Sequence, residues 1–416
     1  MEEVKKNNKV MFLEIFLIIC MCLVTFSGTI EPLVNARTII YIALLGIAVV
    51  LVALKREKLI LNNIIQIQWL ILLLFLVLGL VYTIDSHQLL RILLQYFFYT
   101  FLILMSFKST FYSKILDTFL WVCTILGIII IITLIDKNFV VNNFSFLYSE
   151  STIKSIIGRT ASNAYGGLLG EVAYSAFAMN IGISIIVAKY LTYRKITIAN
   201  WIQLTIFIIG VLVSFKRSLL LIPVLAFLIL FIISKKNNKI KNGIKLFTLL
   251  IVIILIVITI FPETLDTIGR FNTETTNGDV LNGRTELWEY SWEMFLQNPL
   301  IGLGYCSYTM FCASNGFEWN YMAHNIYVQL LGEVGIIGFI IFITFFINAI
   351  IKTLKSIKKE CNEQNLQLLY FSLFMQIVFL LYGLTGNPLY FPQQMMVYII
   401  CISILSNIRN KRSRKK

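Results

Sequence analysis

Hydrophobic residues occupy most of the chain in runs that are long enough to cross a lipid bilayer. A bilayer core requires about 20 apolar residues per helix, with a range of roughly 17 to 25. The pattern therefore predicts an all-α, polytopic membrane protein with about twelve transmembrane helices. The predicted spans are Met11–Ser27, Thr38–Leu54, Ile64–Val81, Leu89–Met105, Ile115–Ile135, Leu168–Ala188, Ile198–Val213, Phe215–Ile233, Ile244–Phe261, Asn325–Ile351, Leu366–Leu384 and Phe391–Leu405.

Two long polar segments interrupt these runs. Residues 136–167 separate the fifth and sixth predicted spans, and residues 262–323 form a larger loop before the tenth. We therefore expect spans one to nine within residues 1–261, then the large loop, then spans ten to twelve with a basic tail within residues 324–416. The large loop runs through His324 directly into an apolar helix, so we expect chemistry there.

Basic residues gather on alternate segments between the predicted spans. These segments, which include both termini, hold 26 of the 35 Lys and Arg residues. Because cytoplasmic loops carry the excess of basic residues, both termini should be cytoplasmic and both long loops should face outward. This bias explains the net charge of +14 without a nucleic-acid partner. The nine outer-side basic residues are Arg37, Arg91, Lys137, Lys154, Arg159, Lys216, Arg217, Arg270 and Arg284.

Lys216 and Arg217 precede an apolar run, Leu219–Ile233, that is too short to span a membrane unless its helix begins at about Phe215. Such a start would draw Arg217 toward membrane depth. An ionisable group there costs about 2.5 kcal/mol or more, so it usually faces a polar cavity. The pair is either an anion site, since the Arg fork suits phosphate, or a tight turn whose arginine reaches the interface.

Glu171 and Glu333 are two of the carboxylates within the predicted spans. Glu171 lies three residues into its span and twelve residues after Arg159, which fits a salt bridge or a catalytic or substrate-orienting carboxylate. Glu333 lies about 12 Å along the helix from Asn325 at 1.5 Å per residue. It has Gly332, Gly335 and Gly338 around it at helix-packing spacing. We expect Glu333 to be a buried, structural partner of a cation.

The large loop contains an amphipathic helix. Trp288, Trp292, Phe295 and Leu296 recur at helical spacing, and the helix should end near Asn298-Pro299. The aromatic side of this helix suits the surface of a membrane, where Trp lies at the headgroup level. It would equally serve as a platform for a sugar or a lipid headgroup, and composition does not separate the two.

His324 is one of two histidines, so a His-cluster metal site cannot be assembled. The chain has no P-loop and no Gly-rich dinucleotide turn, and we expect neither a metal nor another cofactor. His324 is either a polar residue at a helix entrance, with Asn325 as the N-cap, or a functional group. Cys306 and Cys312 share the large loop and could form a disulfide, but their spacing does not establish one.

Residues 283–339 resemble the bacterial O-antigen ligase and O-antigen or capsular polysaccharide polymerase family of integral-membrane glycosyltransferases. The likeness begins with Gly-Arg-x-x-x-Trp at residues 283–288 and continues with Asn-Pro-x-x-Gly-x-Gly at residues 298–304. It ends with His324-Asn325 and the glycines that follow. Residues 214–218 are similar to an outward Arg turn of that family, and Arg159 with Glu171 is similar to an Arg…Glu pattern of some polymerases.

The resemblance implies metal-independent transfer of a glycan from undecaprenyl diphosphate at the outer face of the bacterial cytoplasmic membrane, with inversion at the anomeric carbon. Arg217 and Arg284 would bind the diphosphate as charge-assisted pairs. His324 would be the general base, because its ordinary pKa near 6.5 suits proton transfer at neutral pH. The further candidates are Glu171 for catalysis, Arg159 and Lys216 for the diphosphate, and Asn325 and Trp288 for other parts of the substrate.

Polymerase and ligase share this constellation and differ in the acceptor. The Arg159…Glu171 likeness favours a polymerase, whose partners would include membrane lipid, a flippase and a chain-length regulator. A ligase would transfer the glycan to a lipid core, a protein or the cell wall. A transporter of anions or lipid-linked sugars would also use outward arginines, but it would be expected to show repeated halves, and no repeat is visible.

Overall fold

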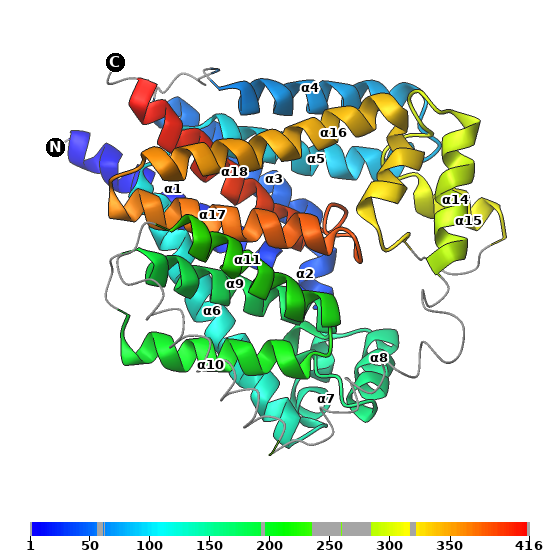
Figure 1. Cartoon of the computed structure of the whole chain (residues 1–416), viewed down its shortest axis with the longest axis horizontal. Helices are drawn as coiled ribbons and strands as arrows, with labels where there is room; N and C mark the ends of the chain where they lie inside the picture. Colours follow the sequence, from blue (N-terminus) through cyan, green and yellow to red (C-terminus); the bar gives the residue numbers. More distant parts are fainter. Residues whose placement is uncertain are drawn as a thin grey trace.

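The structure is a computed structural model that describes residues 2–55, 61, 63–192, 196–234, 259, 284–316 and 322–413. Across these residues the secondary structure is helical and contains no strand. Most of the long helices run side by side, with both termini at one end and α7, α8, α14 and α15 at the other (Figure 1). We call the end that carries these four helices the loop end, and the opposite end the terminal end.

Sixteen α-helices are described. They are α1 Glu2–Thr25, α2 Glu31–Asn35, α3 Arg37–Lys55, α4 Ile64–Leu78, α5 Ser86–Leu104, α6 Ser109–Ile135, α7 Phe139–Phe144, α8 Glu150–Ala161, α9 Val172–Leu191, α10 Ile198–Val213, α11 Arg217–Ile233, α14 Arg284–Gln297, α15 Tyr308–Ser314, α16 Ile326–Lys359, α17 Glu363–Tyr382 and α18 Pro392–Ser413.

Eight of the described helices are long and apolar enough to cross a membrane, and α10, α11 and the apolar part of α18 are shorter apolar helices. These eleven coincide with eleven of the predicted spans, which confirms the prediction of a polytopic, all-helical membrane protein. The predicted ninth span, Ile244–Phe261, lies outside the described residues apart from Thr259. The total of twelve and the division into three parts therefore remain predictions.

Local sequence explains where several helices begin. Side chains of Asp, Asn and Thr occupy N-cap positions, where an oxygen can accept a free backbone N–H of the first turn. Asp85 accepts from Gln88 at the start of α5, and Thr197 forms a reciprocal capping box with Asn200 at the start of α10. Asn325 caps α16 in the same way, as its residue type predicted.

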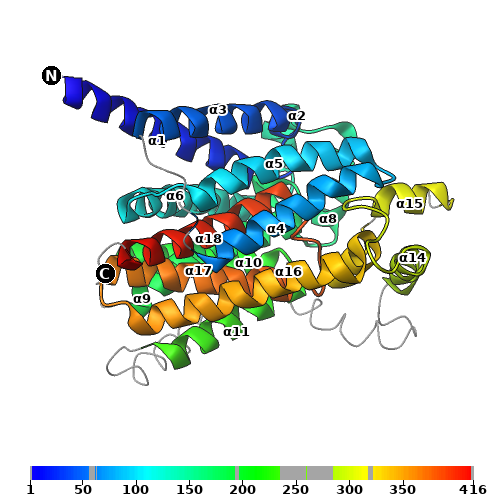
Figure 2. The same cartoon turned by 90° about the horizontal axis from the view of Figure 1, so that it is seen from above.

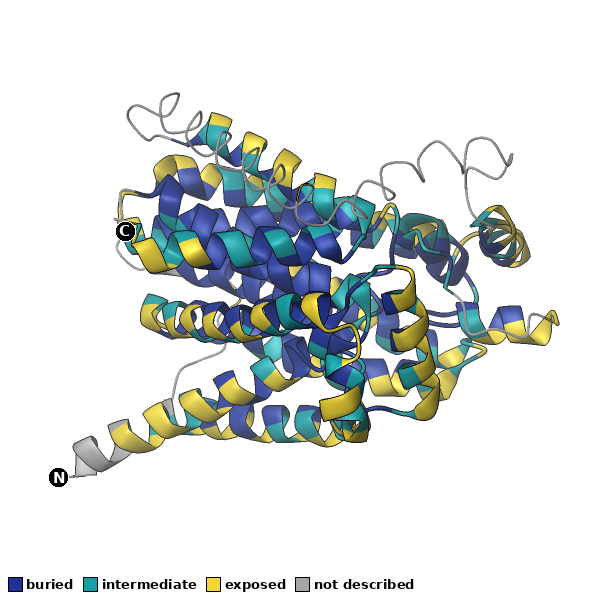
Figure 3. Ribbon diagram, turned by 90° about the horizontal axis from the view of Figure 1, so that it is seen from below, coloured by how far each residue is buried: buried dark blue, intermediate teal, exposed yellow. Residues whose placement is uncertain are grey.

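The centre of the bundle is formed by α9, α17 and α18, and α18 is buried at every residue from Pro392 to Ile408. In Figure 2, α1 and α3 lie at one edge of the bundle. Figure 3 shows broad exposed bands on these two helices, whereas the middle of the bundle is buried. Apolar side chains cover the outer sides of the peripheral helices, as expected of surfaces that face lipid.

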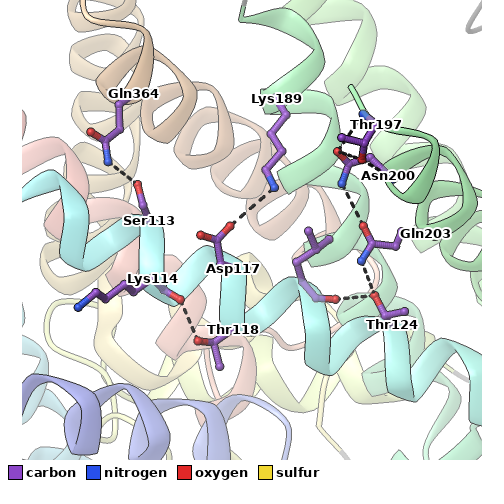
Figure 4. Close-up of polar contacts among 11 residues, drawn as sticks. Ser113, Lys114, Asp117, Thr118, Thr124, Lys189, Thr197, Asn200, Gln203 and Gln364 are labelled. Carbon is purple, nitrogen blue, oxygen red and sulfur yellow. Dashed lines mark hydrogen bonds and ion pairs between the residues drawn. The ribbon is translucent and has the colours of Figure 1, made fainter. Parts of the chain in front are cut away.

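Polar side chains link neighbouring helices of the bundle (Figure 4). Gln203 on α10 donates to the hydroxyl of Thr124 on α6 across 3.1 Å, and Gln364 on α17 donates to Ser113 on α6 across 2.8 Å. Lys189 on α9 lies 3.7 Å from the carboxylate of Asp117 on α6. Interhelical hydrogen bonds of this kind stabilise helix packing where water is scarce.

Candidate active site

A kink in α16 organises the loop end. Gly335 has φ 60° and ψ −171°, which is not helical, so the backbone groups around it are released from the helix. The turn that follows α14 takes up these groups. Ile336 N–H donates to the Pro299 carbonyl across 2.9 Å, and the Glu333 carbonyl accepts from Gly304 N–H across 2.8 Å. The Asn-Pro-x-x-Gly-x-Gly motif and the glycines of α16 are thus two halves of one contact.

Glycine is required on both sides of this contact. A Cβ atom on Gly302 would lie 2.2 Å from the Glu333 carbonyl oxygen, and one on Gly335 would lie 2.5 Å from the Leu300 carbonyl carbon. Both glycines also have positive φ, which residues with a side chain rarely adopt. On the other side of α16, a Cβ atom on Gly332 would lie 2.5 Å from the Ser291 carbonyl oxygen. Gly332 therefore allows α14 to pack closely against α16.

Glu333 is fully buried and accepts four hydrogen bonds that hold the loop end together. Its carboxylate accepts from the backbone N–H of Cys306 across 2.8 Å and from the Tyr390 hydroxyl across 2.9 Å. The Tyr308 N–H and the Gln329 side chain complete the set. The prediction of a buried structural role fits these contacts. The expectation of a cationic partner is wrong for these four hydrogen bonds, because all four donors to the carboxylate are neutral.

The helix α14 ends at Gln297, as the Asn298-Pro299 signal predicted. Its buried side consists of Leu287, Ser291 and Met294, which face α16 and α15, whereas Trp292 is 53% exposed. The aromatic side of the helix is therefore directed away from the bundle. Trp288 lies between the two sides, and its indole N–H donates to the Ala323 carbonyl across 2.9 Å. Trp288 thus contacts the residue directly before His324.

His324 has a backbone φ of 52°, in the left-handed region that non-glycine residues rarely adopt. The residues on either side hold it there. Ala323 N–H donates to Gln329 across 3.2 Å, and Ile326 N–H donates to the Gly383 carbonyl across 2.8 Å. Strained backbone of this kind persists only where surrounding contacts enforce it, and it is concentrated at functional sites.

Two cations act on the His324 imidazole. Burial, followed by the positive charges of Lys216 and Arg284, lowers the pKa of His324 to about 4. Lys216 belongs to the turn before α11, and Arg284 is the first residue of α14. Segments that are distant in the sequence therefore bring two positive charges close to one half-buried histidine.

The turn between α10 and α11 is also strained. Phe215 has φ 56°, and α11 begins at Arg217, so the predicted start of this span at Phe215 was two residues too early. Arg217 therefore lies at the very entrance of its helix. Burial lowers the pKa of Lys216, whereas the negative charge of Glu171 opposes this shift. The turn accordingly lies within electrostatic reach of both Arg284 and Glu171.

Glu171 is paired with Arg159. Oε1 of Glu171 contacts Nη1 of Arg159, and both side chains are about one-third exposed. Glu171 occupies the N-cap position of α9 and does not lie inside the helix, so its expected place three residues into the span was wrong. Gly170, which has φ 73° and fits tightly against Thr29, separates α9 from the short 3-10 helix Gly167–Leu169. This strained turn places the Glu171 carboxylate at the loop end of the bundle.

The structure therefore brings most of the predicted site residues to the loop end. Electrostatic effects connect His324 with Lys216 and Arg284, and connect Lys216 with Glu171 and Arg159. Asn325 and Trp288 are adjacent to this group, and their observed contacts are structural: a helix cap and a bond to Ala323. Arg217 begins the helix next to Lys216.

Sequence reasoning missed three members of this region. Arg37 and Tyr174 belong to it, because Arg37, Arg159 and Glu171 all act on the Tyr174 hydroxyl. Tyr382, at the end of α17, is acted on by both Glu171 and Arg284. A signal existed for Arg37, which is one of the nine basic residues expected on the outer side. The two tyrosines carried no signal, because they lie in apolar spans with nothing to distinguish them.

Cys306 and Cys312 are both buried and both free, so the possible disulfide between them is not formed in this structure. Among the residues that the structure describes, no three His, Cys, Asp or Glu side chains lie together in a way that could hold a metal ion. The chemistry available at the loop end comes from an imidazole, a carboxylate, arginines, a lysine and tyrosines.

The fold and site define an integral-membrane protein of many helices with a histidine and several cations gathered at one end of the bundle. Residues 202–343 match the family model described as O-Antigen ligase, over 142 of the 416 residues. The match confirms the resemblance over this part of the chain. It includes Lys216, Arg217, Arg284 and His324, and it supports a ligase- or polymerase-type glycosyltransferase. No curated protein matches the chain.

Proposed function

We propose that the protein is a polysaccharide polymerase that extends an O-antigen or a capsular glycan. It transfers a glycan from undecaprenyl diphosphate to the sugar of a second lipid-linked repeat unit, at the outer face of the bacterial cytoplasmic membrane. The loop end faces outward, and both termini are cytoplasmic. The observation that carries this proposal is the convergence of Lys216 and Arg284 on His324 at one end of a membrane bundle.

This arrangement suits a lipid-diphosphate donor. The diphosphate brings about two negative charges, which arginine binds through charge-assisted, bidentate hydrogen bonds. Arg284 and Lys216 would hold the diphosphate beside the imidazole, with Arg217 and Arg159 at the edge of the same region. Their positive charges would stabilise the diphosphate as it leaves with the electrons of the broken bond to the anomeric carbon.

His324 would then act as the base. The acceptor hydroxyl oxygen attacks the anomeric carbon, its proton passes to the imidazole, and one displacement inverts the configuration. Burial and the two nearby cations keep His324 neutral before the donor binds, so a proton can be accepted. Bound diphosphate would neutralise those cations and raise the pKa of His324 toward its ordinary value. The base would therefore become stronger only when the donor is in place.

The ion pair between Arg159 and Glu171 supports polymerase over ligase, because these are the two residues of the polymerase-like pattern. Glu171 would orient the acceptor hydroxyl or the donor sugar, and Arg159 would hold Glu171 in place. The ligase alternative keeps the same base and the same cations but requires a second kind of acceptor. A flippase and a chain-length regulator are the partners that a polymerase would need.

Purified protein in lipid nanodiscs can be given undecaprenyl-diphosphate-linked repeat units as the sole substrate. A polymerase should produce a ladder of products from this substrate alone, whereas a ligase should leave it unchanged until another acceptor is added. His324→Ala should lower the transfer rate by a factor of about 10² to 10⁴, the usual contribution of a positioned acid–base group. Donor binding should survive in this variant.

Arg284→Lys and Arg217→Lys keep the charge but lose the planar fork, so both should reduce polymer formation in protein that still accumulates. Arg91→Lys is the matched control, because Arg91 is an exposed residue of α5. Transfer at the parent rate by the His324→Ala variant would contradict the proposed base. Parent-like activity of both lysine variants would contradict bidentate recognition of the diphosphate.

A further inference from the structure

The connection between α17 and α18 carries three buried amide side chains. Asn387, Gln393 and Gln394 are 2%, 4% and 1% exposed. Four of their polar atoms, Oδ1 of Asn387, Oε1 of Gln393 and both Nε2 and Oε1 of Gln394, have no hydrogen-bond partner in the described part of the protein. Leaving such a group unsatisfied costs about 1–3 kcal/mol, and buried polar groups are generally paired. Four such atoms within eight residues call for a ligand.

This connection lies between the two candidate catalytic residues. At one side, the Gly383 carbonyl accepts from Ile326, two residues after His324. At the other side, the Phe391 ring lies 5.5 Å from the ring of Tyr174, three residues after Glu171. The amides therefore belong to the segment that joins the His324 side of the loop end to the Glu171 side.

Gln393 shows which atom is available to a ligand. Its Nε2 donates to the Gly28 carbonyl across 3.2 Å, and this bond fixes the orientation of the amide and leaves Oε1 as a free acceptor. The neighbouring Ser27 hydroxyl accepts from Nη2 of Arg37 across 3.4 Å. Thr29, in the same turn, donates its N–H to the Leu169 carbonyl across 3.1 Å. The turn thus places Gln393 close to the residues that lead into Glu171.

The chemistry of these atoms distinguishes between ligands. The four unsatisfied amide atoms are three oxygen acceptors and one N–H donor. A phosphate offers only acceptors and would leave the amide oxygens unsatisfied, whereas a sugar hydroxyl both donates and accepts. The positive charges of Lys216 and Arg284 lie on the His324 side and suit the phosphate. The uncharged amides suit hydroxyl groups.

We propose that Asn387, Gln393 and Gln394 form a sugar-binding subsite that recognises the hydroxyl groups of the glycan next to the bond that is made or broken. This inference rests on the proposed function and adds the residues that bind the sugar. The diphosphate is bound by the cations, and the sugar is bound by the α17–α18 connection. The identity of the repeat unit would then depend on this connection.

The test replaces each amide singly with an apolar side chain of similar size: Asn387→Leu, Gln393→Met and Gln394→Met. Two inhibitors of transfer are compared, namely the repeat-unit oligosaccharide without its lipid diphosphate, and undecaprenyl diphosphate without sugar. Inhibition by the oligosaccharide should weaken roughly tenfold or more, since about 1.4 kcal/mol is a factor of ten and hydrogen bonds of this kind contribute about that much. Inhibition by undecaprenyl diphosphate should not change.

Thermal stability separates binding from structure. Gln394→Met, which removes an amide with both polar atoms unsatisfied, should leave the melting temperature unchanged or raise it, whereas Gln393→Met also loses the bond to the Gly28 carbonyl and should melt slightly lower. Gln203→Met is the matched control, because both polar atoms of its buried amide are bonded: Nε2 donates to Thr124 and Oε1 accepts from Asn200, each across 3.1 Å. That variant should melt at a lower temperature and bind the oligosaccharide normally.

Two outcomes would overturn the subsite. One is unchanged inhibition by the oligosaccharide in all three amide variants, which would mean that only ordered water satisfies the amides. The other is a parallel loss of stability and of both inhibitions, which would make the amides structural. The activity of the parent enzyme distinguishes failure of the proposed function from failure of the subsite. If it produces no ladder of products, the proposed function fails, whereas an active parent with parent-like amide variants contradicts the subsite alone.

Discussion

Trp288 donates its indole N–H to the carbonyl of Ala323 across 2.9 Å and thereby joins α14 to the residue directly before His324. Arg284 lies one turn earlier on the same helix and acts electrostatically on the His324 imidazole. One short helix therefore supplies a cation to the site and also positions the proposed base. The position of α14 is fixed in turn by its close packing at Gly332 of α16.

Trp288→Phe should keep the ring in place but remove this hydrogen bond. A hydrogen bond contributes about 0.5–1.5 kcal/mol, so we expect transfer to fall by up to roughly tenfold while insertion and donor binding persist. Trp292→Phe on the exposed side of α14 is the matched control and should be nearly silent. The measurement is the transfer rate of each variant in nanodiscs. Equal activity in the two variants would show that the Ala323 contact does not position His324.

Gly335→Ala and Gly302→Ala should both be strongly destabilising. Each position has a positive φ, and each new methyl group would lie within 2.5 Å of backbone atoms across the contact. Strain of this kind costs of order 1–3 kcal/mol, and the clash adds to it. Gly316→Ala is the control, because Gly316 has φ 86° but no atom within 4 Å of the added carbon. Melting temperatures should fall far more in the first two variants than in the third.

The helices were largely predictable because membrane-spanning runs are set by length and hydrophobicity, which the sequence carries locally. The kink at Gly335 was not predictable, since a glycine that packs a helix and a glycine that breaks one look the same in sequence. The strained entrances at His324 and Phe215 were likewise invisible, because contacts with distant segments impose them.

The candidate site was likewise only partly predictable from the sequence. Unusual residue types in unusual places marked Arg284, His324 and the Lys216-Arg217 pair, and the structure brings His324, Lys216 and Arg284 together. The contribution of the α17–α18 connection depends on contacts between segments that are far apart in sequence. The bond from Ile326 to Gly383 is one example, and no pattern in a single sequence predicts it.

The Arg159–Glu171 pair should behave as a unit. Arg159→Gln and Glu171→Gln each leave one charge without its partner, so each should reduce transfer. The double variant should be no worse than the more damaged single variant, because residues in direct contact have non-additive effects. A double-mutant cycle on transfer rate measures this coupling. Simple additivity of the two effects would show that the ion pair is irrelevant to the reaction.

The proposed orientation can be checked with a natural probe. Cys361 is exposed in the short connection between α16 and α17, at the terminal end. An impermeant thiol reagent applied to intact cells should leave Cys361 unlabelled and should label a cysteine introduced at Ser314, which is exposed at the loop end. Labelling of Cys361 should appear after the membrane is permeabilised. The opposite pattern would place the candidate site in the cytoplasm.

The protonation of His324 gives the sharpest test of the cation cluster. Its pKa is lowered to about 4 by burial and by the charges of Lys216 and Arg284. Between pH 4 and the ordinary value of 6.5, the unfolded chain binds a proton that the folded histidine does not bind. The contribution to stability is therefore greatest above pH 6.5 and is lost as the pH falls toward 4.

Catalysis should follow the same pKa. Because kcat/KM reports the free enzyme, it should stay level as the pH is lowered from 8 to about 5 and should fall only as His324 becomes protonated near pH 4. Lys216→Gln removes one positive charge, so the acidic limb should move to higher pH. Lys137→Gln is the control, because Lys137 bonds to Asn163 and is not among the groups that act on His324. An acidic limb near pH 6.5 in the parent, unmoved by Lys216→Gln, would contradict both the proposed base and its electrostatic environment.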